Sequence, residues 1–470
     1  MKNFSPHSFH IPVLGLGFTI DTPLKVARFG ISSVLSIVED EMIERMRSVY
    51  SRRYGLDYTP ISPKEEDYRA RRITAYLNMA DIIVARQVAE LRALPFEQGN
   101  ELSTYFELLP QGALLRKAYD QMLALEEGPE KDSLQDYLRL KVQPGSIDVN
   151  IMSKVNKQNY DKNGELLPRE YNDALAALRG FANSTLTSSV VFSAGYSPDL
   201  YAYAEEFPCF YPNEAGELPK NIILKVSDYR SALTQGKIMA KKGIWVSEYR
   251  IESGLNCGGH AFATDGLLLG PIMEEFRKNR QELEAELFTM CNEGLVRKGL
   301  HPFATSPGVR VTVQGGIGTA AEHRFLLEHY GADSCGWGSP FLLVPEATSV
   351  EETTLQQLAT ASKDDYYLSE ASPLGVPFHN FRKSSGEAQR KQRIEKGRPG
   401  SPCYKEFLVS NTEFTDKPIC TASRQYLHLK VRELEAQALP AEQHALAMDA
   451  LTVKDCLCEG LSASPILASG

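Results

Sequence analysis

Short runs of apolar and β-branched residues recur along most of the chain, and helical stretches separate them. Strands that alternate with helices indicate parallel βαβ units, because parallel neighbours need a crossover connection. Eight such runs predict an α/β fold, a closed (β/α)8 TIM barrel, with an open doubly wound sheet as the alternative. The predicted strands cover residues 11–16, 31–38, 149–155, 189–194, 222–226, 244–251, 309–313 and 332–335.

The barrel pattern is interrupted by a helical insertion and followed by an extension. Amphipathic patterns predict helices over residues 68–94 and 114–125, in an insertion that forms a lid or side domain. Residues 271–298 predict a solvated crossover helix with Pro271 in its first turn. The predicted domains are 1–62 (start of the barrel), 63–144 (helical insertion), 145–345 (rest of the barrel) and 346–470 (C-terminal extension with metal-binding cysteines).

Charge and hydropathy exclude several classes of protein. With 60 acidic and 51 basic side chains the net charge is −9, which argues against nucleic acid as a partner. The chain is 43% hydrophobic, too much for a disordered acidic protein. No apolar run approaches the roughly 20 residues of a membrane span, and the first residues lack a signal-peptide layout. We therefore expect a cytoplasmic protein, whose sequence leaves open whether it forms a homo-oligomer.

Half of the eight cysteines lie in the extension, at Cys403, Cys420, Cys456 and Cys458. In a large and presumed cytosolic protein this clustering favours metal ligation over disulfides. Four thiolates suit a tetrahedral zinc ion or an iron–sulfur cluster. The spacing of Cys456 and Cys458 is too tight for a zinc knuckle, so the cluster is favoured, with zinc and free or redox-regulatory thiols as alternatives.

Two glycine-rich turns follow the last two predicted strands. Gly315 and Gly316 follow the seventh strand, and Gly336, Gly338 and Ser339 follow the eighth. Barrels of this kind hold phosphate groups at these turns, where bare backbone N–H groups face the anion. The pair of turns predicts a phosphate site, and the alternative is two ordinary glycine turns.

A third glycine motif follows the sixth predicted strand, where Gly258 and Gly259 precede His260. Paired glycines let a planar ligand approach the backbone closely, and a histidine there can exchange a proton near neutral pH. A tight turn with a packed histidine explains the same residues equally well.

The order of these motifs resembles the FMN-dependent nitronate monooxygenase and enoyl-ACP reductase II superfamily, whose members are (β/α)8 flavoproteins. The similarity covers roughly residues 9–50 and 145–382. Gly15, Gly17 and Asn150 fall where that family contacts its flavin, as does the turn at residues 193–195. The chain has Phe18 after Gly17 where the family usually shows a Gly-Gly-Met.

One branch of that superfamily is more similar in layout, the bifunctional acyl-ACP dehydrogenase/isomerases with FMN and a [4Fe-4S] cluster. Residues 372–377 (SPLGVP) match a segment that this branch places after its barrel, and Cys458 begins a matching CEGL end. The spacing differs, because sixteen residues separate Cys403 from Cys420. The resemblance implies FMN, a [4Fe-4S] cluster on the four cysteines, and a fatty acyl thioester of acyl carrier protein or coenzyme A.

The resemblance also implies roles for individual residues. His260 would be the acid/base that moves a proton α to the thioester carbonyl while hydride moves to or from FMN. Lys225 would hold the polar edge of the flavin or be a lysine without a role. The cluster would pass electrons or hold the tail together.

Other functions stay open at this point. Within the enzymes they are nitronate oxidation and NAD(P)H-dependent enoyl reduction, and outside them a non-catalytic flavin and iron–sulfur redox-sensing scaffold. The basic run over residues 382–398 would dock an acidic carrier protein or serve as a solvated linker.

Overall fold

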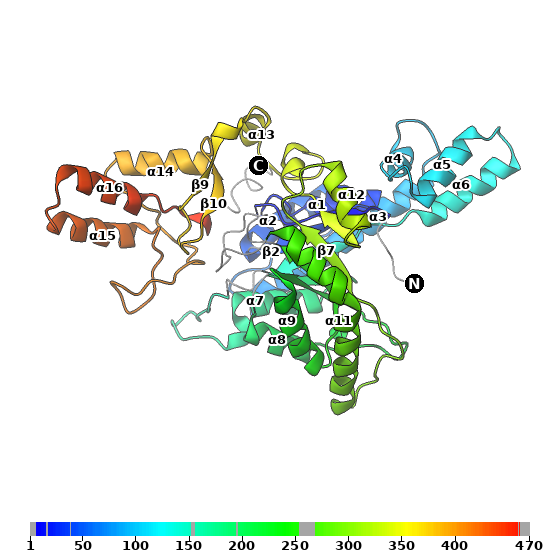
Figure 1. Ribbon diagram of the computed structural model, residues 1–470, viewed down its shortest axis with the longest axis horizontal. Coiled ribbons are helices and arrows are strands. Elements are labelled where there is room, and N and C mark those ends of the chain that lie inside the picture. Colours follow the sequence, from blue (N-terminus) through cyan, green and yellow to red (C-terminus); the bar gives the residue numbers. More distant parts are fainter. Residues whose placement is uncertain are drawn as a thin grey trace.

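The chain folds into a closed barrel of eight parallel strands that pair in sequence order (Figure 1). The ring closes between the last and first strands, where Phe9 lies opposite Cys335 and His10 lies opposite Gly336. With helices between the strands this is a (β/α)8 barrel, so the predicted fold is confirmed and the open sheet is wrong. The structure describes residues 6–15, 17–37, 39–151, 156–193, 196–252, 268–458 and 460. The strands are β1 (Phe9–Ile11), β2 (Ser32–Ile37), β3 (Ile147–Ile151), β4 (Ser189–Phe192), β5 (Asn221–Val226), β6 (Val246–Glu252), β7 (Arg310–Gln314) and β8 (Ser334–Gly336).

All eight strands differ by one or more residues from their predicted bounds, and two of the differences have identifiable reasons. The first ends at Ile11, before Pro12, which has no N–H to donate to a neighbouring strand. The third begins at Ile147, and it includes Asp148 although a charge is unusual inside a barrel. Asp148 is tolerated there because Arg250 of β6 pairs with it at 3.0 Å.

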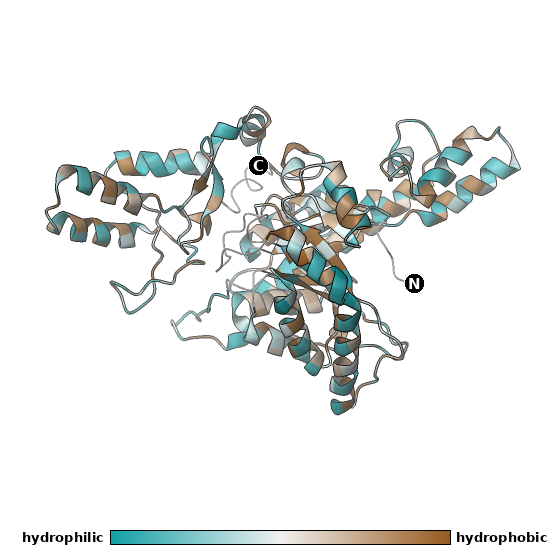
Figure 2. Cartoon of the chain, in the orientation of Figure 1, coloured by the Kyte–Doolittle hydropathy of each residue, from teal (hydrophilic) through white to brown (hydrophobic). Residues whose placement is uncertain are grey.

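Helices cover the outside of the barrel, and apolar residues concentrate on the strands (Figure 2). Leu35, Ile37, Val149 and Ile151 belong to the core shared by strands and helices. The predicted helices at 68–94, 114–125 and 271–298 are observed, each within two residues of its expected ends. The helices around the barrel and in the insertion are α1 (Thr22–Val26), α2 (Asp40–Tyr54), α3 (Tyr68–Ala93), α4 (Glu101–Glu107), α5 (Leu114–Ala124), α6 (Pro129–Lys141), α7 (Asp173–Ala182), α8 (Pro198–Tyr203), α9 (Tyr229–Lys241), α11 (Leu269–Arg297) and α12 (Ala320–Glu328).

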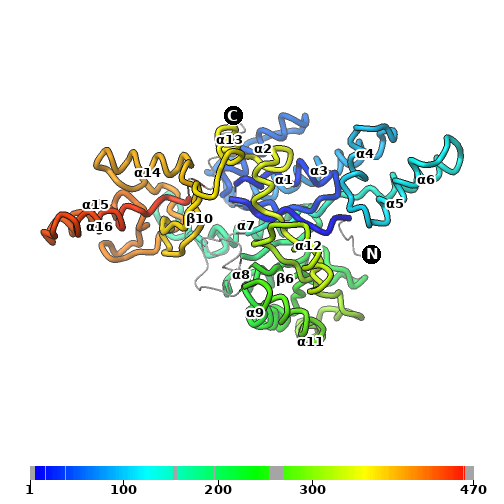
Figure 3. The backbone as a smooth tube through the Cα atoms, turned by 45° about the horizontal axis from the view of Figure 1, so that its top comes forward, coloured from blue at the N-terminus to red at the C-terminus, as the bar shows by residue number. Residues whose placement is uncertain are grey.

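The segment between β2 and β3 has two parts. Helix α3 packs between α2 and α7 as part of the outer layer of the barrel. Helices α4, α5 and α6 project away from it at one end of the molecule, and the C-terminal extension lies at the other end (Figure 3). The barrel therefore lies between two lobes.

The extension has its own small framework of helices around a two-stranded antiparallel sheet. Lys454 donates to the carbonyls of Glu370 and Ser372, which ties the end of the extension to the segment before its second strand. No described helix combines the length and apolarity needed to cross a membrane. The elements are α13 (Glu352–Ala359), β9 (Tyr366–Ser369), β10 (Phe378–Phe381), α14 (Ser385–Glu395), α15 (Arg424–Ala436) and α16 (Ala441–Thr452).

The barrel contains both an apolar cluster and an ionic network. Val34, Val191 and Ile223 form a small apolar cluster. Arg250 bridges two carboxylates, Asp148 at 3.0 Å and Glu248 at 2.7 Å. Burial by itself raises the pKa of Glu248, but Arg250 and Arg310 lower it to about 2. The acid therefore stays charged, and the ion network links three strands, β3, β6 and β7.

Candidate functional site

Polar side chains gather at the C-terminal ends of the barrel strands, the face on which (β/α)8 enzymes carry their active sites. They come from the ends of β2, β3, β5, β6 and β7, which the closed topology brings into one ring. The residues are Ser36, Asn150, Lys225, Glu252 and Gln314.

A chain of hydrogen bonds runs around this face. Gln314 donates to Glu252 at 2.9 Å, and Glu252 pairs with Lys225 at 3.2 Å. On the other side the Nε2 atom of His10 lies 3.4 Å from the amide oxygen of Gln314, and its Nδ1 atom lies 3.2 Å from Ser334. The chain joins five strands and fixes the orientation of the Gln314 amide and the Lys225 ammonium.

His10 is an uncharged member of this chain. Burial and the nearby positive charge of Arg250 lower its pKa to about 3. At neutral pH the imidazole therefore donates from Nε2 and accepts at Nδ1, which matches its two partners. It orients Gln314 and is not an acid/base near pH 7.

Asn150, predicted from the sequence as a flavin contact, lies at this face with an unused acceptor. Its Nδ2 atom donates to Ser36 at 3.3 Å, while its Oδ1 atom is buried and has no hydrogen-bond partner among the residues that the structure describes. A buried carbonyl oxygen without a donor costs free energy, so such an atom in a ligand-binding face marks where a ligand N–H would fit.

The two glycine turns begin side by side, because Gln314 pairs with Gly336 in adjacent strands. Gly315 and Gly316 have φ angles of 89° and 74°, which other residues rarely adopt. A Cβ atom on Gly336 would lie 2.6 Å from Gln314, so this glycine serves packing. Gly338 and the exposed Ser339 follow, at the start of a 3-10 turn.

A nearby helix end is already satisfied. At the N-terminus of α12, the backbone N–H groups of Gly318 and Thr319 both donate to the carboxylate of Glu322 at 2.9 Å. Thr319 completes a capping box with the same residue. An anion bound near these turns would therefore bind the backbone N–H groups around Gly316 and Gly338, because those at the start of α12 already donate to Glu322.

The remaining sequence predictions for the mouth have different outcomes. Gly15 has a φ angle of 48°, and its carbonyl accepts from the N–H of Gly17 at 2.7 Å in the turn after β1. Gly258, Gly259 and His260 lie outside the described residues, and their roles stay predictions.

The four cysteines of the extension come together although the first and last are 55 positions apart (458 − 403). The thiol of Cys420 donates a hydrogen bond to Cys403, which lowers the pKa of Cys403 and raises that of Cys420. Cys456 and Cys458 form a second contacting pair, and Cys456 also interacts with Cys403 and Cys420. As these side chains stand, the described residues include no group of three or more His, Cys, Asp or Glu that could hold a metal ion.

Backbone N–H groups point at three of these sulfurs. Glu406 donates to Cys403, and Phe407 donates to Cys458. Ala422 donates to Cys420. Cys403 and Glu406 both have φ angles of 55°, in a region that residues other than glycine rarely adopt. Strained backbone of this kind persists where it serves a site, and here it turns amides toward thiols.

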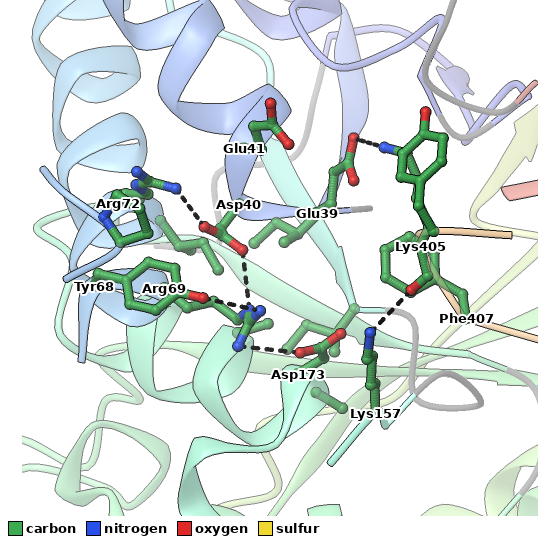
Figure 4. Close-up of a pocket in the computed structure, with 17 residues that line it drawn as sticks. Glu39, Asp40, Glu41, Tyr68, Arg69, Arg72, Lys157, Asp173, Lys405 and Phe407 are labelled. Atoms are coloured by element: carbon green, nitrogen blue, oxygen red, sulfur yellow. Dashed lines mark hydrogen bonds and ion pairs between the residues drawn. The ribbon is translucent and has the colours of Figure 1, made fainter. Parts of the chain in front are cut away.

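The segment of residues 403–407, called the cysteine loop here, lies against the barrel. Lys405 pairs with Glu39, which follows β2, and Lys157 pairs with Glu406 at 3.4 Å. Lys157 also donates to the carbonyl of Lys405 at 3.1 Å. A pocket of about 430 Å³ lies beneath this loop, with Asp40 between Arg69 and Arg72 on its far wall (Figure 4).

The basic run of the extension is partly committed to internal contacts. Arg390 pairs with Glu387 and donates to the carbonyl of Thr452, and Arg393 donates to Ser401. Lys391, Lys396 and Arg398 are exposed. Any carrier-docking surface would therefore depend on the exposed residues only.

Sequence reasoning missed His10, Ser36, Glu252 and Gln314 as parts of the site. The only sequence signal for them is a polar residue within or at the end of an otherwise apolar strand. One such residue by itself is weak evidence for a functional site. No protein-family model matches the chain, and no curated protein matches it. The function is inferred below from these side chains.

Proposed function

We propose that this protein is an FMN-dependent oxidoreductase that acts on an acyl thioester. The observation that carries the proposal is the barrel face that carries Asn150, Lys225 and Gln314 near the ends of β3, β5 and β7, together with two adjacent glycine turns. A planar, hydrogen-bonding cofactor with a phosphate tail matches this combination of one unused acceptor, oriented donors and open backbone.

The residues present fit FMN on three counts. The Oδ1 atom of Asn150, which has no partner among the described residues, would accept an N–H of the flavin, and Lys225 and Gln314 would bind its polar edge. The turns at Gly315–Gly316 and Gly338–Ser339 would hold the phosphate. When bound, FMN supplies hydride transfer.

The protein's own groups orient the reactants and move the proton. Glu252 keeps Lys225 and Gln314 in place, since it pairs with both. His260, by the family resemblance, exchanges the proton α to the thioester carbonyl. His260→Ala should leave the flavin bound and lower turnover by ~10²–10⁴-fold, the usual contribution of one positioned acid/base.

We further propose that Cys403, Cys420, Cys456 and Cys458 hold a [4Fe-4S] cluster. Four soft thiolates with backbone N–H donors are the donor set that such clusters use. The loop that carries Cys403 contacts the barrel, so the cluster would lie beside the mouth.

The test is anaerobic purification with analysis of flavin, iron and sulfide. The proposal expects one FMN, released by heat, and about four iron and four sulfide per chain. Cys456→Ser should remove iron and sulfide, while Cys291→Ser in α11 should not. FAD or no flavin in the folded protein contradicts the flavin site, and stoichiometric zinc without sulfide contradicts the cluster.

Substrate assays separate the proposed activity from its alternatives. A bound flavin that an acyl thioester bleaches supports the enzyme, and one that only nitronates or NAD(P)H reduce favours the other activities. A flavin inert to all of these favours the redox-sensing scaffold.

Carrier docking is tested by changing Lys391, Lys396 and Arg398 to Glu. The change should slow turnover of carrier-bound substrate only, and the reduction in rate should be smaller at high salt.

A further inference from the structure

We infer that the pocket beneath the cysteine loop binds the hydrocarbon chain of an acyl substrate. The inference rests on the proposed function for the identity of the substrate, and on the pocket's own lining for the chemistry of what enters it. The pocket lies outside the ring of strands, between β2 and β3 on one side and α2, α3 and α7 on the other. Ile37 and Ile151, the last residues of β2 and β3, place it next to the barrel mouth.

The size of the pocket suits a small-molecule ligand. Its volume of about 430 Å³ falls within the range of about 300–1,000 Å³ that is usual for ligand sites. Two small residues on one face of α7, Ala174 and Ala177, keep it open toward the strands. Larger side chains at these positions would fill the space.

The charged groups of the pocket are paired with one another. Arg69 bridges Asp40 at 3.0 Å and Asp173 at 3.2 Å, and Arg72 binds the second oxygen of Asp40 at 2.7 Å. Lys405 pairs with Glu39 across the pocket.

The two other charged residues of the lining are paired with residues outside it. Lys157 pairs with Glu406, and Glu41 pairs with Arg45. An ionic ligand would have to break one of these pairs, and a partly buried ion left without its partner is costly. The buried part of the occupant is therefore uncharged.

The rest of the lining is aliphatic or aromatic. Ile37, Ile73 and Ile151 line the pocket together with the two alanines of α7. Phe407 of the cysteine loop lines it on the side of the extension (Figure 4). Such a surface gains free energy from hydrocarbon at about 25 cal/mol per Å² buried. Because the roof belongs to the cysteine loop, the chain would lie between the barrel and the predicted cluster, with its polar end free to reach the mouth.

The test uses the fluorescent fatty acid cis-parinaric acid with the purified full-length protein. We expect saturable binding, at least tenfold weaker in Ala177→Leu, which fills the pocket. The matched control Ala182→Leu makes the same change at the end of the same helix, away from the lining, and should bind like the wild type. Phe407→Ala truncates a half-buried loop residue, so it tests the roof even if Ala177→Leu fails to fold.

Competition decides which end of the ligand the pocket recognises. Dodecanol should displace the probe about as well as dodecanoate, because the buried part is uncharged. The inference would be overturned if neither Ala177→Leu nor Phe407→Ala weakened binding of the probe, or if Ala182→Leu weakened it as much as they do. It would also be overturned if dodecanoate displaced the probe and dodecanol did not. Flavin and iron content report separately on the proposed function, so pocket-dependent binding in a protein without flavin would refute that function and leave the pocket standing.

Discussion

Replacing Gly336 with alanine tests the packing beneath the candidate flavin site. The new Cβ atom would lie 2.6 Å from the Cβ atom of Gln314 and 2.8 Å from Nε2 of His10. Ordinary contacts between carbon atoms are about 3.5–4.0 Å, so each neighbour must move by roughly 1 Å. Both neighbours are buried, and neither can move away without cost.

The expected destabilisation of Gly336→Ala follows from this geometry. Overpacking a well-filled core costs about 1–3 kcal/mol, and two contacts below 3.0 Å place this change toward the upper end. The weakest link is the 3.4 Å contact between His10 and Gln314, so we expect it to break first. For a domain of about 150–250 residues, each kcal/mol lowers the melting temperature by about 2–4 °C.

Thermal unfolding followed by circular dichroism measures the effect, with Gly318→Ala as the matched control. A Cβ atom on Gly318 meets nothing closer than 3.5 Å, so its unfolding free energy should change by less than about 0.5 kcal/mol. A Gly336→Ala variant that melts with the wild type would show that the neighbours relax freely, and the packing argument would fail.

Two further predictions concern the barrel interior. Arg250→Met should lower the unfolding free energy by about 3–5 kcal/mol in urea titrations, because it leaves Asp148 buried without a cation and leaves Glu248 with the partly exposed Arg310 alone. Removing all three charges together should recover most of that loss, and a triple variant as unstable as the single one would contradict the explanation. The pKa of His10 is lowered in the folded protein from its ordinary 6.5 to about 3. As the pH falls, His10 is therefore protonated in the unfolded chain before it is protonated in the folded protein. Its contribution to stability is complete above pH 6.5 and decreases by about 1.4 kcal/mol per pH unit between about 6.5 and 3. His10→Asn should remove this slope when unfolding free energies are compared over that range, and an unchanged slope would mean that the imidazole is charged in the folded protein.

The fold was predictable because it depends on a pattern repeated along the chain. Each apolar run buries its outward side against helices, as Leu35 and Val149 do, and the repetition compensates for errors at single strand ends. The glycine turns and the grouping of four cysteines were also visible, since unusual residue types mark them. The structure places Cys403 beside Cys420 and Cys456 beside Cys458.

The rest of the site depends on three-dimensional pairing that one sequence does not reveal. The polar chain from Ser334 through His10 to Gln314 joins residues more than 300 positions apart. Asp148 appears unsuited to a strand until Arg250 is seen beside it. The pocket under the cysteine loop combines three helices, two strands and the extension, and none of its lining residues is distinctive alone.

The seam between β1 and β8 has a consequence for how the protein is made. Both strands are three residues long, and the partners His10 and Ser334 are 324 positions apart. At ~5–20 residues per second, a ribosome needs roughly 16–65 s to synthesise that interval. During this time β1 lacks its neighbour β8, so the unfinished sheet has one open edge at β1 and another at the strand made last. Either edge can pair with other chains. The nascent polypeptide is therefore most prone to aggregation just before its eighth strand emerges, and chaperones would matter most at that stage of translation.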